Sequence, residues 1–531
     1  MDHNDFSKCL TNPKIYGNNV IKVTLIQTHI SYVALTGKYA YKIKKPVNFG
    51  FLDFSSLDKR KYFCNEELKL NKRLCPEIYE SVVSITKKDD SFEIDGKGEI
   101  IDYALKMKQF SQDNIISNKL SKDEIDKDTI DKIIDQLVSF YHKEESNEEI
   151  NEFGKVNTIK QNTDENFEQT KEIIDVVIQK EKYDTIKKIT NKFLEEKKDI
   201  FQKRIKEGFI KDCHGDLHSG NIVIKEGKIC IFDCIEFNKR FRYGDQASDI
   251  AFLAMDLDYQ GRPYLSSYLI KRYVEKSNDK EIYDVLNFYK SYRAYVRGKV
   301  AGFRLSDPNL NDAEKKDIIM TAQKYFDLSY YFINLLKAQM KSKKPILFIT
   351  TGLTGTGKTS ISNKISVDYN AKKISTDEVR KELLGIDKYE RHHEPYNTGI
   401  YSPEKMNEIY EKIVEMGKDE LIKNKNVILD ATFKTKKLRN KAKFITDKIK
   451  SKFLIINSIA PEEVVKKYLE DRVKKKSISD GRWEIYKKQK NSFEKLDSDE
   501  NYILIDVSNK DYGYQIDIFS KIYHNIMRDE I

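Results

Sequence analysis

The segment Gly352–Thr359, which reads Gly-Leu-Thr-Gly-Thr-Gly-Lys-Thr, constrains the fold of this chain more than any other feature. It follows the apolar run 345–351, which predicts a buried strand, and a helical pattern begins at Lys358. Glycines let a backbone curl so that successive N–H groups face phosphate oxygens, and the following helix adds the positive end of its dipole. This order of strand, loop and helix predicts an α/β P-loop domain with a parallel sheet that binds a nucleoside triphosphate.

The side chains of this loop and of one later strand predict how ATP and Mg²⁺ are held. Lys358 can reach the outer phosphates, and the hydroxyl of Thr359 can bind the metal. Asp430 ends the apolar strand 427–430 and is expected to act through a metal-bound water. A turn aspartate is the alternative for Asp430. The predicted ATP-binding residues of this domain are Gly352, Thr354, Gly355, Thr356, Gly357, Lys358, Thr359 and Ser360.

Two features favour a kinase over a simple NTPase, namely the segment around Asp377 and the apolar strand that ends in Asp430. Asp377 follows a short predicted strand, at the carboxyl end where open α/β sheets bind ligands, and we expect this strand beside the P-loop strand. There a carboxylate can accept a hydroxyl proton, and Arg380 can hold a substrate phosphate. A helix N-cap is the alternative for Asp377. The basic segment 470–482 predicts a lid over the transferring phosphate, with Arg472 as the first candidate and Arg482 as the second. A solvated helix face is the alternative there.

Residues 344–500 resemble the P-loop kinases related to polynucleotide kinase, chloramphenicol phosphotransferase and zeta toxins. The resemblance rests on the strings GLTGTGKTS, STDEVRKELLG, YSPEKMNEIY, VILDATF and SDGRWEIYKKQ. It implies that the aspartate of the D-x-x-R element, here Asp377, is the catalytic base or a substrate anchor, with Arg380 beside it.

A second motif lies upstream, at His214–Asn221, and reads His-Gly-Asp-Leu-His-Ser-Gly-Asn. A phosphotransferase of the kinase fold needs a base for the acceptor hydroxyl and two metal ligands. Asp216 can be the base, Asn221 can reach a metal, and Asp233, after the next predicted strand, can be the second ligand. The succession of loop, strand, turn and strand predicts that the three side chains converge.

The region before this motif predicts the rest of an ATP site. Lys42 lies on a predicted strand and is expected to bind the α- and β-phosphates, with a carboxylate partner from the next helix. Glu67 is the favoured partner, and Glu66 is the alternative. The glycine-rich loop of protein kinases is replaced by Gln-Thr-His-Ile-Ser at 27–31, where hydroxyl and imidazole groups are expected to donate in place of backbone amides.

These residues resemble the aminoglycoside phosphotransferase and choline kinase branch of the protein-kinase-like fold. More narrowly, they resemble a bacterial group in which such a domain is fused to a P-loop kinase. The resemblance implies that Asp249 stabilises the fold and orients the catalytic loop. Further marks of the group are the segments 27–31, 45–54, 232–237 and 243–252.

The pattern of predicted elements changes at the basic residues 341–344, as expected of a domain boundary in a chain of 531 residues. We predict an α+β bilobal protein-kinase-like domain at 1–340, followed by an α/β P-loop domain at 343–531. The N-lobe of the first domain should extend to about residue 105, and its C-lobe should cover about 106–340.

The cysteine pattern and the distribution of apolar residues indicate the cellular compartment of the protein. The six cysteines are scattered without a C-x-x-C pair, which predicts neither a zinc site nor a disulfide framework and fits a reducing compartment. The first residues are polar and acidic, and no apolar run approaches the roughly 18 residues that span a bilayer. We therefore expect a soluble, cytoplasmic protein without a membrane partner, and the sequence does not predict its oligomeric state.

The two motifs together predict a bifunctional, Mg²⁺-dependent phosphotransferase with two ATP sites and a small-molecule or nucleotide hydroxyl as acceptor. In one alternative the first domain binds nucleotide without transfer and regulates the second, although its set of Asp216, Asn221 and Asp233 is complete. In another the chain phosphorylates nucleic-acid ends, as the net charge of +10 and the basic second domain suggest. No recognisable nucleic-acid-binding module accompanies that charge.

Overall fold

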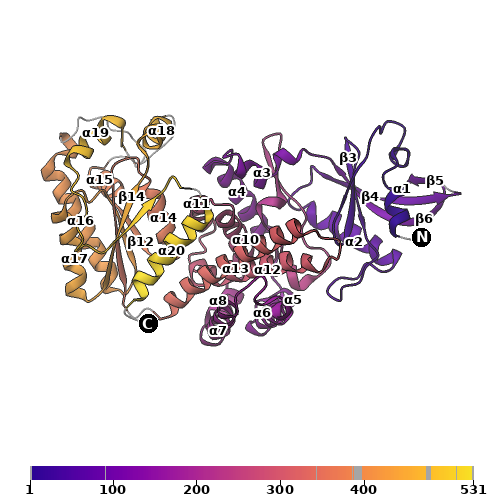
Figure 1. Cartoon of the computed structure of the whole chain (residues 1–531), viewed down its shortest axis with the longest axis horizontal. Coiled ribbons are helices and arrows are strands. Elements are labelled where there is room, and N and C mark those ends of the chain that lie inside the picture. The colour runs from indigo at the N-terminus through magenta and orange to yellow at the C-terminus, as the bar shows by residue number, and fades with distance from the viewer. Residues whose placement is uncertain are drawn as a thin grey trace. The chain divides into compact units, whose positions relative to one another are not determined.

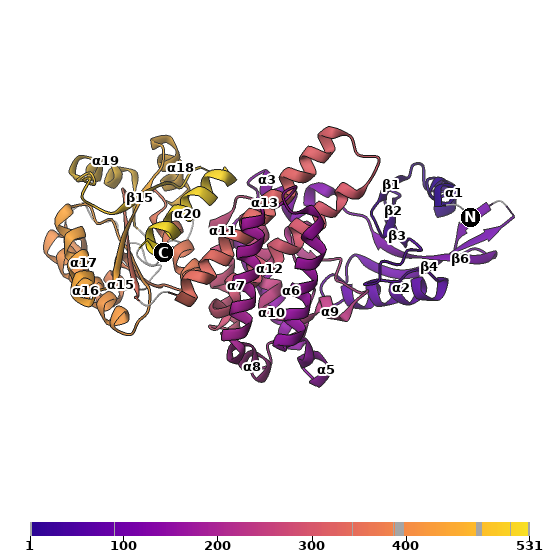
Figure 2. The same ribbon diagram turned by 60° about the horizontal axis from the view of Figure 1, so that its bottom comes forward.

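The computed structural model describes residues 3–89, 91–341, 344–385, 387, 398–473, 480–509 and 511–528. Its backbone divides into two compact units, which are treated separately below. Figures 1 and 2 show the ribbon of the whole chain in two orientations. Over these ranges the structure contains no helix that is long and apolar enough to cross a membrane. Unit 1 comprises Met1–Glu165, Glu196–Asp256 and Arg272–Asp279, and unit 2 comprises Asn166–Glu195, Leu257–Lys271 and Lys280–Ile531.

Unit 1 begins with an antiparallel sheet whose strands lie in the order β1-β2-β3-β6-β4-β5. Alternate apolar side chains, such as Tyr32, Ala34, Tyr41 and Ile43, form the core on one face. Helix α2 (Leu57–Asn71) follows β3 and packs against β4 and β6. The strands are β1 Thr24–Gln27, β2 Ser31–Leu35, β3 Tyr39–Lys44, β4 Tyr79–Lys88, β5 Ser91–Ile94 and β6 Glu99–Lys108, and helix α1 is His3–Cys9.

The remainder of unit 1 is mainly helical and contains two short antiparallel pairs, β8 with β9 and β7 with β10. The guanidinium of Arg204 is buried and forms ion pairs with Asp245 (2.5 Å) and Asp279 (2.8 Å). A sheet with one helix, followed by a helical part that carries a loop and a hairpin, is the protein-kinase-like fold that the sequence predicted. The elements are α3 Ile116–Ser121, α4 Lys127–Lys143, α5 Glu148–Asn151, α8 Lys198–Lys206, β7 Ile210–Asp212, β8 Ile222–Lys225, β9 Lys228–Ile231, α9 Lys239–Arg242 and β10 Tyr243–Asp245.

Four helices contribute residues to both units. They are α6 Val156–Thr170, α7 Lys180–Glu196, α10 Gln246–Tyr259 and α11 Pro263–Ser277.

A disulfide lies in unit 1, contrary to the sequence prediction. It joins Cys75, which precedes β4, to Cys230 of β9, and the two Cα atoms are 4.7 Å apart. The prediction was wrong because the two cysteines are 155 positions apart, and only the folded topology brings them together. The cysteine pattern therefore gives no support for a reducing compartment.

Unit 2 contains a five-stranded parallel sheet in the order β12-β13-β11-β14-β15. Figure 1 shows α16 and α17 on one side of this sheet and α14 and α20 on the other. This is the predicted α/β P-loop domain, and every residue of β11 is buried. The elements are β11 Ile346–Thr351, α14 Lys358–Asp368, β12 Lys372–Ser375, α15 Thr376–Leu383, α16 Pro403–Ile422, β13 Val427–Asp430, α17 Lys436–Ile449, β14 Lys452–Ile459, α18 Glu462–Val473, α19 Trp483–Ser492, β15 Tyr502–Asp506 and α20 Tyr512–Met527.

From the sequence we expected the strand before Asp377, β12, to lie beside the P-loop strand β11. The structure does not bear this out. β13 lies between them, because Val427 is paired with both Leu347 of β11 and Lys372 of β12. The expectation failed because strand order depends on long crossovers that a local pattern does not encode.

Two long helices that the sequence placed in the first domain, α12 (Ile282–Phe303) and α13 (Asp312–Lys341), belong to unit 2. Asn287 donates a hydrogen bond to the backbone oxygen of Asp368 (3.0 Å), and Tyr331 donates one to its Oδ2 (2.7 Å). Residues 342 and 343 of the predicted boundary lie outside the described ranges. The independent folding of 1–340 and 343–531 stays a prediction.

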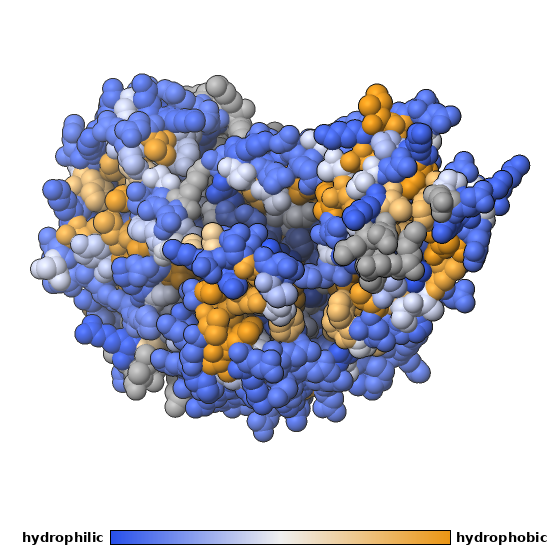
Figure 3. Space-filling view, turned by 45° about the vertical axis from the view of Figure 1, so that its right-hand side comes forward, coloured by the Kyte–Doolittle hydropathy of each residue, from blue (hydrophilic) through white to orange (hydrophobic). Residues whose placement is uncertain are grey.

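The surface is strongly polar, as expected of a chain with 34% charged residues. On the face in Figure 3, hydrophilic side chains predominate and apolar ones form separate patches. Scattered apolar side chains are normal on protein surfaces and need no functional explanation.

Candidate active sites

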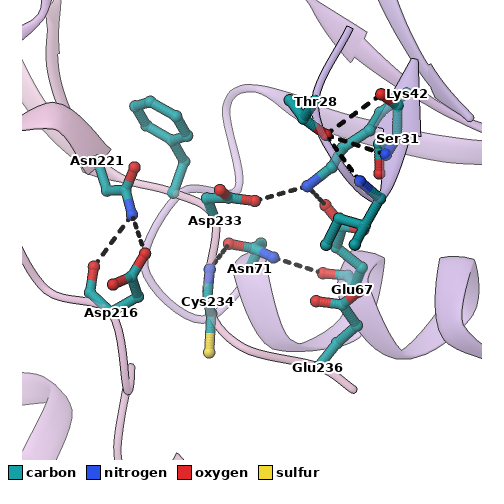
Figure 4. Close-up of polar contacts among 12 residues, drawn as sticks. Thr28, Ser31, Lys42, Glu67, Asn71, Asp216, Asn221, Asp233, Cys234 and Glu236 are labelled. Atoms are coloured by element: carbon teal, nitrogen blue, oxygen red, sulfur yellow. Dashed lines mark hydrogen bonds and ion pairs between the residues drawn. The ribbon is translucent and has the colours of Figure 1, made fainter. Parts of the chain in front are cut away.

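In unit 1 the predicted lysine and carboxylates come together from three segments (Figure 4). Lys42 of β3 donates to Oε1 of Glu67 on α2 (2.7 Å) and to Oδ1 of Asp233 (2.6 Å). Burial lowers the pKa of Lys42, but Asp233 and Glu67 outweigh burial and raise that pKa well above its usual value. Of the two glutamates weighed in the sequence, the structure brings Glu67 to the lysine.

A second layer of charge, which the sequence analysis missed, lies behind this group. Lys44 donates to Oε2 of Glu67 (2.7 Å) and to Glu236, and both Lys44 and Glu236 are buried. Burial alone would raise the pKa of Glu67, but Lys42 and Lys44 outweigh it and hold that pKa at about 2. Its spacing could have identified Lys44, because it lies two residues after Lys42, and residues two apart on a strand share a face.

The predicted base and one predicted metal ligand lie side by side in the loop before β8 (Figure 4). The Nδ2 group of Asn221 donates to the backbone oxygen of Asp216 (3.0 Å) and to its Oδ2 (3.1 Å). This leaves the carboxamide oxygen of Asn221, the atom that a cation would take. Nε2 of His218 is 3.5 Å from Oδ2 of Asp216.

Two carboxylates of α10 hold the backbone of this loop. Asp249 accepts hydrogen bonds from the N–H groups of His214 (2.7 Å) and Gly215 (3.0 Å). Asp256 accepts one from the N–H of Ser219 (2.9 Å). The position implied for Asp249 by the family resemblance fits these contacts, whereas the sequence analysis did not identify Asp256.

The backbone at Asp233 is constrained. Its φ of 65° lies in the left-handed region, which non-glycine residues seldom adopt. Its N–H donates to the hydroxyl of Tyr79 (3.1 Å), and the N–H of Cys234 donates to Oδ1 of Asn71 (2.9 Å). The side chain of Asp233 is 44% exposed, so a carboxylate oxygen beside Lys42 is accessible to a ligand.

The turn at 27–31, which replaces a glycine-rich loop, is closed by hydrogen bonds between its own residues. The N–H of Thr28 donates to the backbone oxygen of Ser31 (2.9 Å), and the Thr28 hydroxyl accepts the N–H of Ser31 (2.9 Å) (Figure 4). The Ser31 hydroxyl is buried and makes no hydrogen bond within the described part of the chain. His29 is exposed.

In unit 2 the loop between β11 and α14 has the geometry that its glycines require. Gly352, Gly355 and Gly357 have φ values of 132°, 81° and 85°. A Cβ at Gly352 would lie 2.3 Å from the backbone oxygen of Ser458, so a side chain there would force the loop away from β14. The N–H of Thr354 donates to Oε1 of Gln489 (2.8 Å), a contact that the sequence did not predict.

Lys358 is the centre of the predicted P-loop site. Its Nζ donates to the backbone oxygen of Leu353 (2.8 Å). Burial lowers its pKa to about 8, against the opposing effects of Asp430 and Asp377, and Arg472 lowers it further. The structure thus brings these three predicted residues into the electrostatic surroundings of Lys358. Thr359 and Ser360 follow it in the first turn of α14, and Thr359 is exposed.

Asp430 and Asp377 differ in their contacts. Asp430 ends β13, and its buried Oδ2 makes no hydrogen bond with any described residue, although Nζ of Lys373 is 3.6 Å away. Asp377 lies in the first turn of α15, whose N-cap position is Ser375, so Asp377 is not the N-cap. Its Oδ1 accepts a hydrogen bond from Nη2 of Arg380 (2.9 Å).

Part of the predicted lid can be located. Arg472 lies near the end of α18, and Arg482 is the N-cap residue of α19, while 474–479 lie outside the described ranges. A Cβ on Gly481 would be 2.1 Å from Oγ1 of Thr354 and 3.3 Å from Nη1 of Arg472. The segment around Gly481 therefore contacts the P-loop directly.

The chain is similar to known proteins over part of unit 2 and, more weakly, over most of its length. Residues 347–496 match a family model described as an AAA domain. An uncharacterised protein of Mycobacterium tuberculosis H37Rv is 28% identical over 415 residues, which are 78% of this chain and 79% of that protein. An uncharacterised protein of Mycobacterium bovis matches to the same extent.

Two solved structures are each similar to part of the chain. A choline/ethanolamine kinase family protein from Mesorhizobium loti is 9% identical and covers 63% of this chain and 99% of its own, with a TM-score of 0.37. A gluconokinase from Sinorhizobium meliloti is 13% identical and covers 36% of this chain and 100% of its own, with a TM-score of 0.25. By its own fold, the chain joins a unit with the protein-kinase-like fold to an α/β P-loop unit, in which residues 347–496 match the model described as an AAA domain.

Proposed function

We propose that this chain is a bifunctional ATP-dependent phosphotransferase with two Mg·ATP sites, one in each unit. Each site would transfer the γ-phosphoryl group to a hydroxyl of a small-molecule or nucleotide acceptor. The observation that carries the proposal is that each unit gathers its own lysine and carboxylates from distant segments. These groups are Lys42 with Glu67 and Asp233 in unit 1, and Lys358 with Asp377 and Asp430 in unit 2.

In unit 1, Lys42 binds the α- and β-phosphates and Glu67 fixes its position. Asp216 accepts the proton of the acceptor hydroxyl, while Asn221 and Asp233 hold Mg²⁺. The carboxamide oxygen of Asn221 and the partly exposed carboxylate of Asp233 fit a hard cation that prefers oxygen ligands.

In unit 2, the backbone N–H groups of the loop from Gly352 to Ser360 surround the phosphates, and Lys358 binds the outer ones. Thr359 would bind Mg²⁺ and Asp430 would hold it through a metal-bound water, and the buried Oδ2 of Asp430, which makes no hydrogen bond with a described residue, fits this assignment. When bound, the metal neutralises charge that develops on the phosphates during transfer.

The acceptor side of unit 2 involves two further groups. Asp377 accepts the proton of the acceptor hydroxyl, and Arg472 closes over the transferring phosphate. Both contribute to the electrostatic surroundings of Lys358, which supports their placement at the γ-phosphate.

A regulatory role for unit 1 is the second candidate. It is favoured by the turn at 27–31, which uses the hydroxyl of Thr28 internally and so offers fewer donors to a phosphate. In this case unit 1 would bind nucleotide without transferring it, and the only transfer would occur in unit 2.

The test is a metabolite screen with γ-labelled ATP on the full chain and on two variants, Asp216→Asn and Asp377→Asn. Each substitution keeps the shape of the side chain and removes one proton acceptor, so each should lower transfer from its own site by about 10²–10⁴-fold. The bifunctional proposal expects different labelled products to disappear in the two variants. Loss of every product in Asp377→Asn, with no change in Asp216→Asn, would favour the regulatory candidate.

A matched measurement separates the base from the metal ligand in unit 1. Asp216→Asn should leave ATP affinity nearly unchanged, whereas Asp233→Ala should weaken Mg·ATP binding. The dissociation constants are measured by calorimetry in a Lys358→Ala background, which silences unit 2. Equal losses of affinity in the two variants would contradict these roles.

A further inference from the structure

A buried polar cluster lies next to Asp377 and was not explained by the roles assigned above. Its members are Arg380 of α15, Tyr401 of the short helix Gly399–Tyr401, and Asp480. Nη2 of Arg380 lies 2.9 Å from Oδ1 of Asp377 and 3.5 Å from Oδ2 of Asp480. The Tyr401 hydroxyl donates to the same oxygen of Asp480, and the guanidinium of Arg380 lies 4.5 Å from the centre of the Tyr401 ring.

Two polar atoms of this cluster are buried without a hydrogen bond in the described part of the chain, Nε of Arg380 and Oδ1 of Asp480. The two residues are only 2% and 8% exposed. A buried polar atom without a partner costs about 1–3 kcal/mol, so a cluster that retains two of them indicates a missing ligand. Nε is a donor and a carboxylate oxygen is an acceptor. One hydroxyl group can satisfy both, because it accepts one hydrogen bond and donates another.

The charges of the cluster disfavour a phosphate in this position. Arg380 already faces two carboxylates, Asp377 and Asp480, so its charge is compensated. Nζ of Lys381 is 3.9 Å from Oδ1 of Asp480, which brings these four charges to balance. A phosphate bound to Arg380 would approach both carboxylates, and like charges at such distances repel strongly in a buried site.

The cluster is also adjacent to the site of transfer. Gly481 follows Asp480, and a Cβ on Gly481 would lie 2.1 Å from Oγ1 of Thr354 in the P-loop. Asp377 joins the cluster to Lys358 through its contact with Arg380 and its effect on the lysine. A molecule held by Asp480 and Arg380 would therefore lie within reach of both the proton acceptor and the nucleotide.

We propose that this cluster forms an acceptor pocket for an uncharged polyhydroxy compound, with Asp480 and Arg380 holding one hydroxyl while a second hydroxyl meets Asp377. The inference rests on the proposed kinase function of unit 2. In the transfer, the second hydroxyl oxygen forms the new bond to the γ-phosphorus, and its proton passes to Asp377. The bond between that phosphorus and the bridging oxygen breaks, which releases ADP. Arg380 thus recognises a hydroxyl, whereas the sequence had suggested that it holds a substrate phosphate.

The test measures binding without turnover, on the full chain saturated with Mg²⁺ and a non-hydrolysable ATP analogue. The probes are glucose, ribose, glycerol and myo-inositol, each paired with its monophosphate, and affinities are obtained by ligand-observed NMR. At least one neutral compound should bind, and its monophosphate should bind at least tenfold more weakly. Absence of binding by every neutral probe, or tighter binding of the phosphorylated partner, would overturn the proposal.

Variants assign the bound probe to this pocket. Asp480→Asn retains an acceptor for the Tyr401 hydroxyl but loses the charge, and should raise the dissociation constant of the neutral probe at least tenfold. Tyr401→Phe should raise it by a smaller factor. Asp447→Asn makes the same chemical change at an exposed position of α17 and should have no effect. An unchanged affinity in Asp480→Asn would overturn the assignment, provided that the fluorescence of Trp483 shows a folded unit.

A parallel assay with γ-labelled ATP separates this inference from the kinase proposal. If binding depends on Asp480 but no label is transferred, the kinase function would be contradicted and the assignment of the pocket would stand. If label is transferred to a neutral acceptor whose affinity does not depend on Asp480, the kinase function would stand and the assignment of the pocket would be overturned.

Discussion

The pKa values of the two predicted phosphate-binding lysines are shifted in opposite directions. Lys42 is paired with Glu67 and Asp233, and its pKa is raised well above the usual lysine value. Among the described residues, Lys358 donates to a neutral backbone oxygen, and burial lowers its pKa to about 8. If both bind ATP, Lys42 must exchange a carboxylate for phosphate, whereas Lys358 must only retain its proton.

The lowered pKa of Lys358 predicts how ATP binding to unit 2 depends on pH. Below pH 8 the free protein already carries the proton, so the dissociation constant of Mg·ATP should change little. Above pH 8 binding requires proton uptake, because the phosphate favours the charged lysine, and the dissociation constant should rise toward tenfold per pH unit. Phosphate itself, with a pKa of about 6, does not titrate in this range.

Calorimetry between pH 7 and pH 9.5 checks this expectation, in a Lys42→Met background that silences unit 1. The control is Lys358→Arg, whose guanidinium stays charged throughout the range and should remove the pH dependence. A dependence of equal size in the control would show that another group is responsible.

At the scale of elements, one chain of ion pairs, largely buried except at Asp233, joins three segments of unit 1. Lys42 and Lys44 of β3 bind Glu67 of α2 from two sides, and each also binds an acid of the segment after β9, Asp233 or Glu236. Lys42 is expected to leave Asp233 when nucleotide binds. The pair of Lys44 and Glu236 would then keep the strand, the helix and the segment in place.

Removal of Lys44 should therefore destabilise unit 1. Lys44→Met leaves Glu236 buried without its cation, and the loss of one partner of a buried ion pair costs about 3–5 kcal/mol. Hydrogen exchange of the amides of β3 and α2 should become about 10²–10³-fold faster. Lys69→Met, at an exposed position of the same helix, should change exchange little. Equal exchange rates in the two variants would contradict a structural role for Lys44.

The sequence predicted those parts of the sites that depend on local patterns. The P-loop glycines, Lys358 and Asp216 belong to motifs in which the chemistry needs a fixed spacing. The roles of Asp480 and Glu236 were missed because each depends on a contact with a residue at least 79 positions away. The partner of Asp480 is Tyr401, and the partner of Glu236 is Lys44.

Strand order escaped prediction for a related reason. The position of β13 between β11 and β12 and the bond between Cys75 and Cys230 both depend on long-range topology. Hydrophobic periodicity predicts that a strand exists, but it does not predict its neighbour.

At the scale of the whole molecule, the helices next to the predicted boundary are bound to the P-loop helix within unit 2. Lys364 and Asp368 of α14 form a buried ion pair (2.5 Å), and Tyr331 of α13 donates to the same carboxylate. Lys290 of α12 is buried in an ion pair with Asp258 (2.5 Å). A cut at 341–344 would separate Tyr331 from Asp368, so the independent folding of 343–531 depends on how well these groups tolerate exposure.

The importance of this contact is measured by Asp368→Ala in the full chain. The substitution leaves Lys364 buried without its nearest anion and should lower the free energy of unfolding of unit 2 by about 3–5 kcal/mol. The only tryptophan, Trp483, lies in unit 2, and its fluorescence follows urea unfolding of that unit. Asp419→Ala, at an exposed position of α16, should shift the transition by no more than about 0.5 kcal/mol. Similar transitions in both variants would show that the pair contributes little.

The central claim, that the chain has two separate ATP sites, is tested most directly by the stoichiometry of nucleotide binding. Equilibrium dialysis of the full chain with Mg²⁺ and a labelled non-hydrolysable ATP analogue should give two molecules bound per chain. Lys42→Met and Lys358→Ala should each reduce this number to one, because each removes the phosphate-binding lysine of one unit, and the double variant should bind none. A single molecule bound to the unaltered chain, or the loss of both molecules in either single variant, would contradict the account.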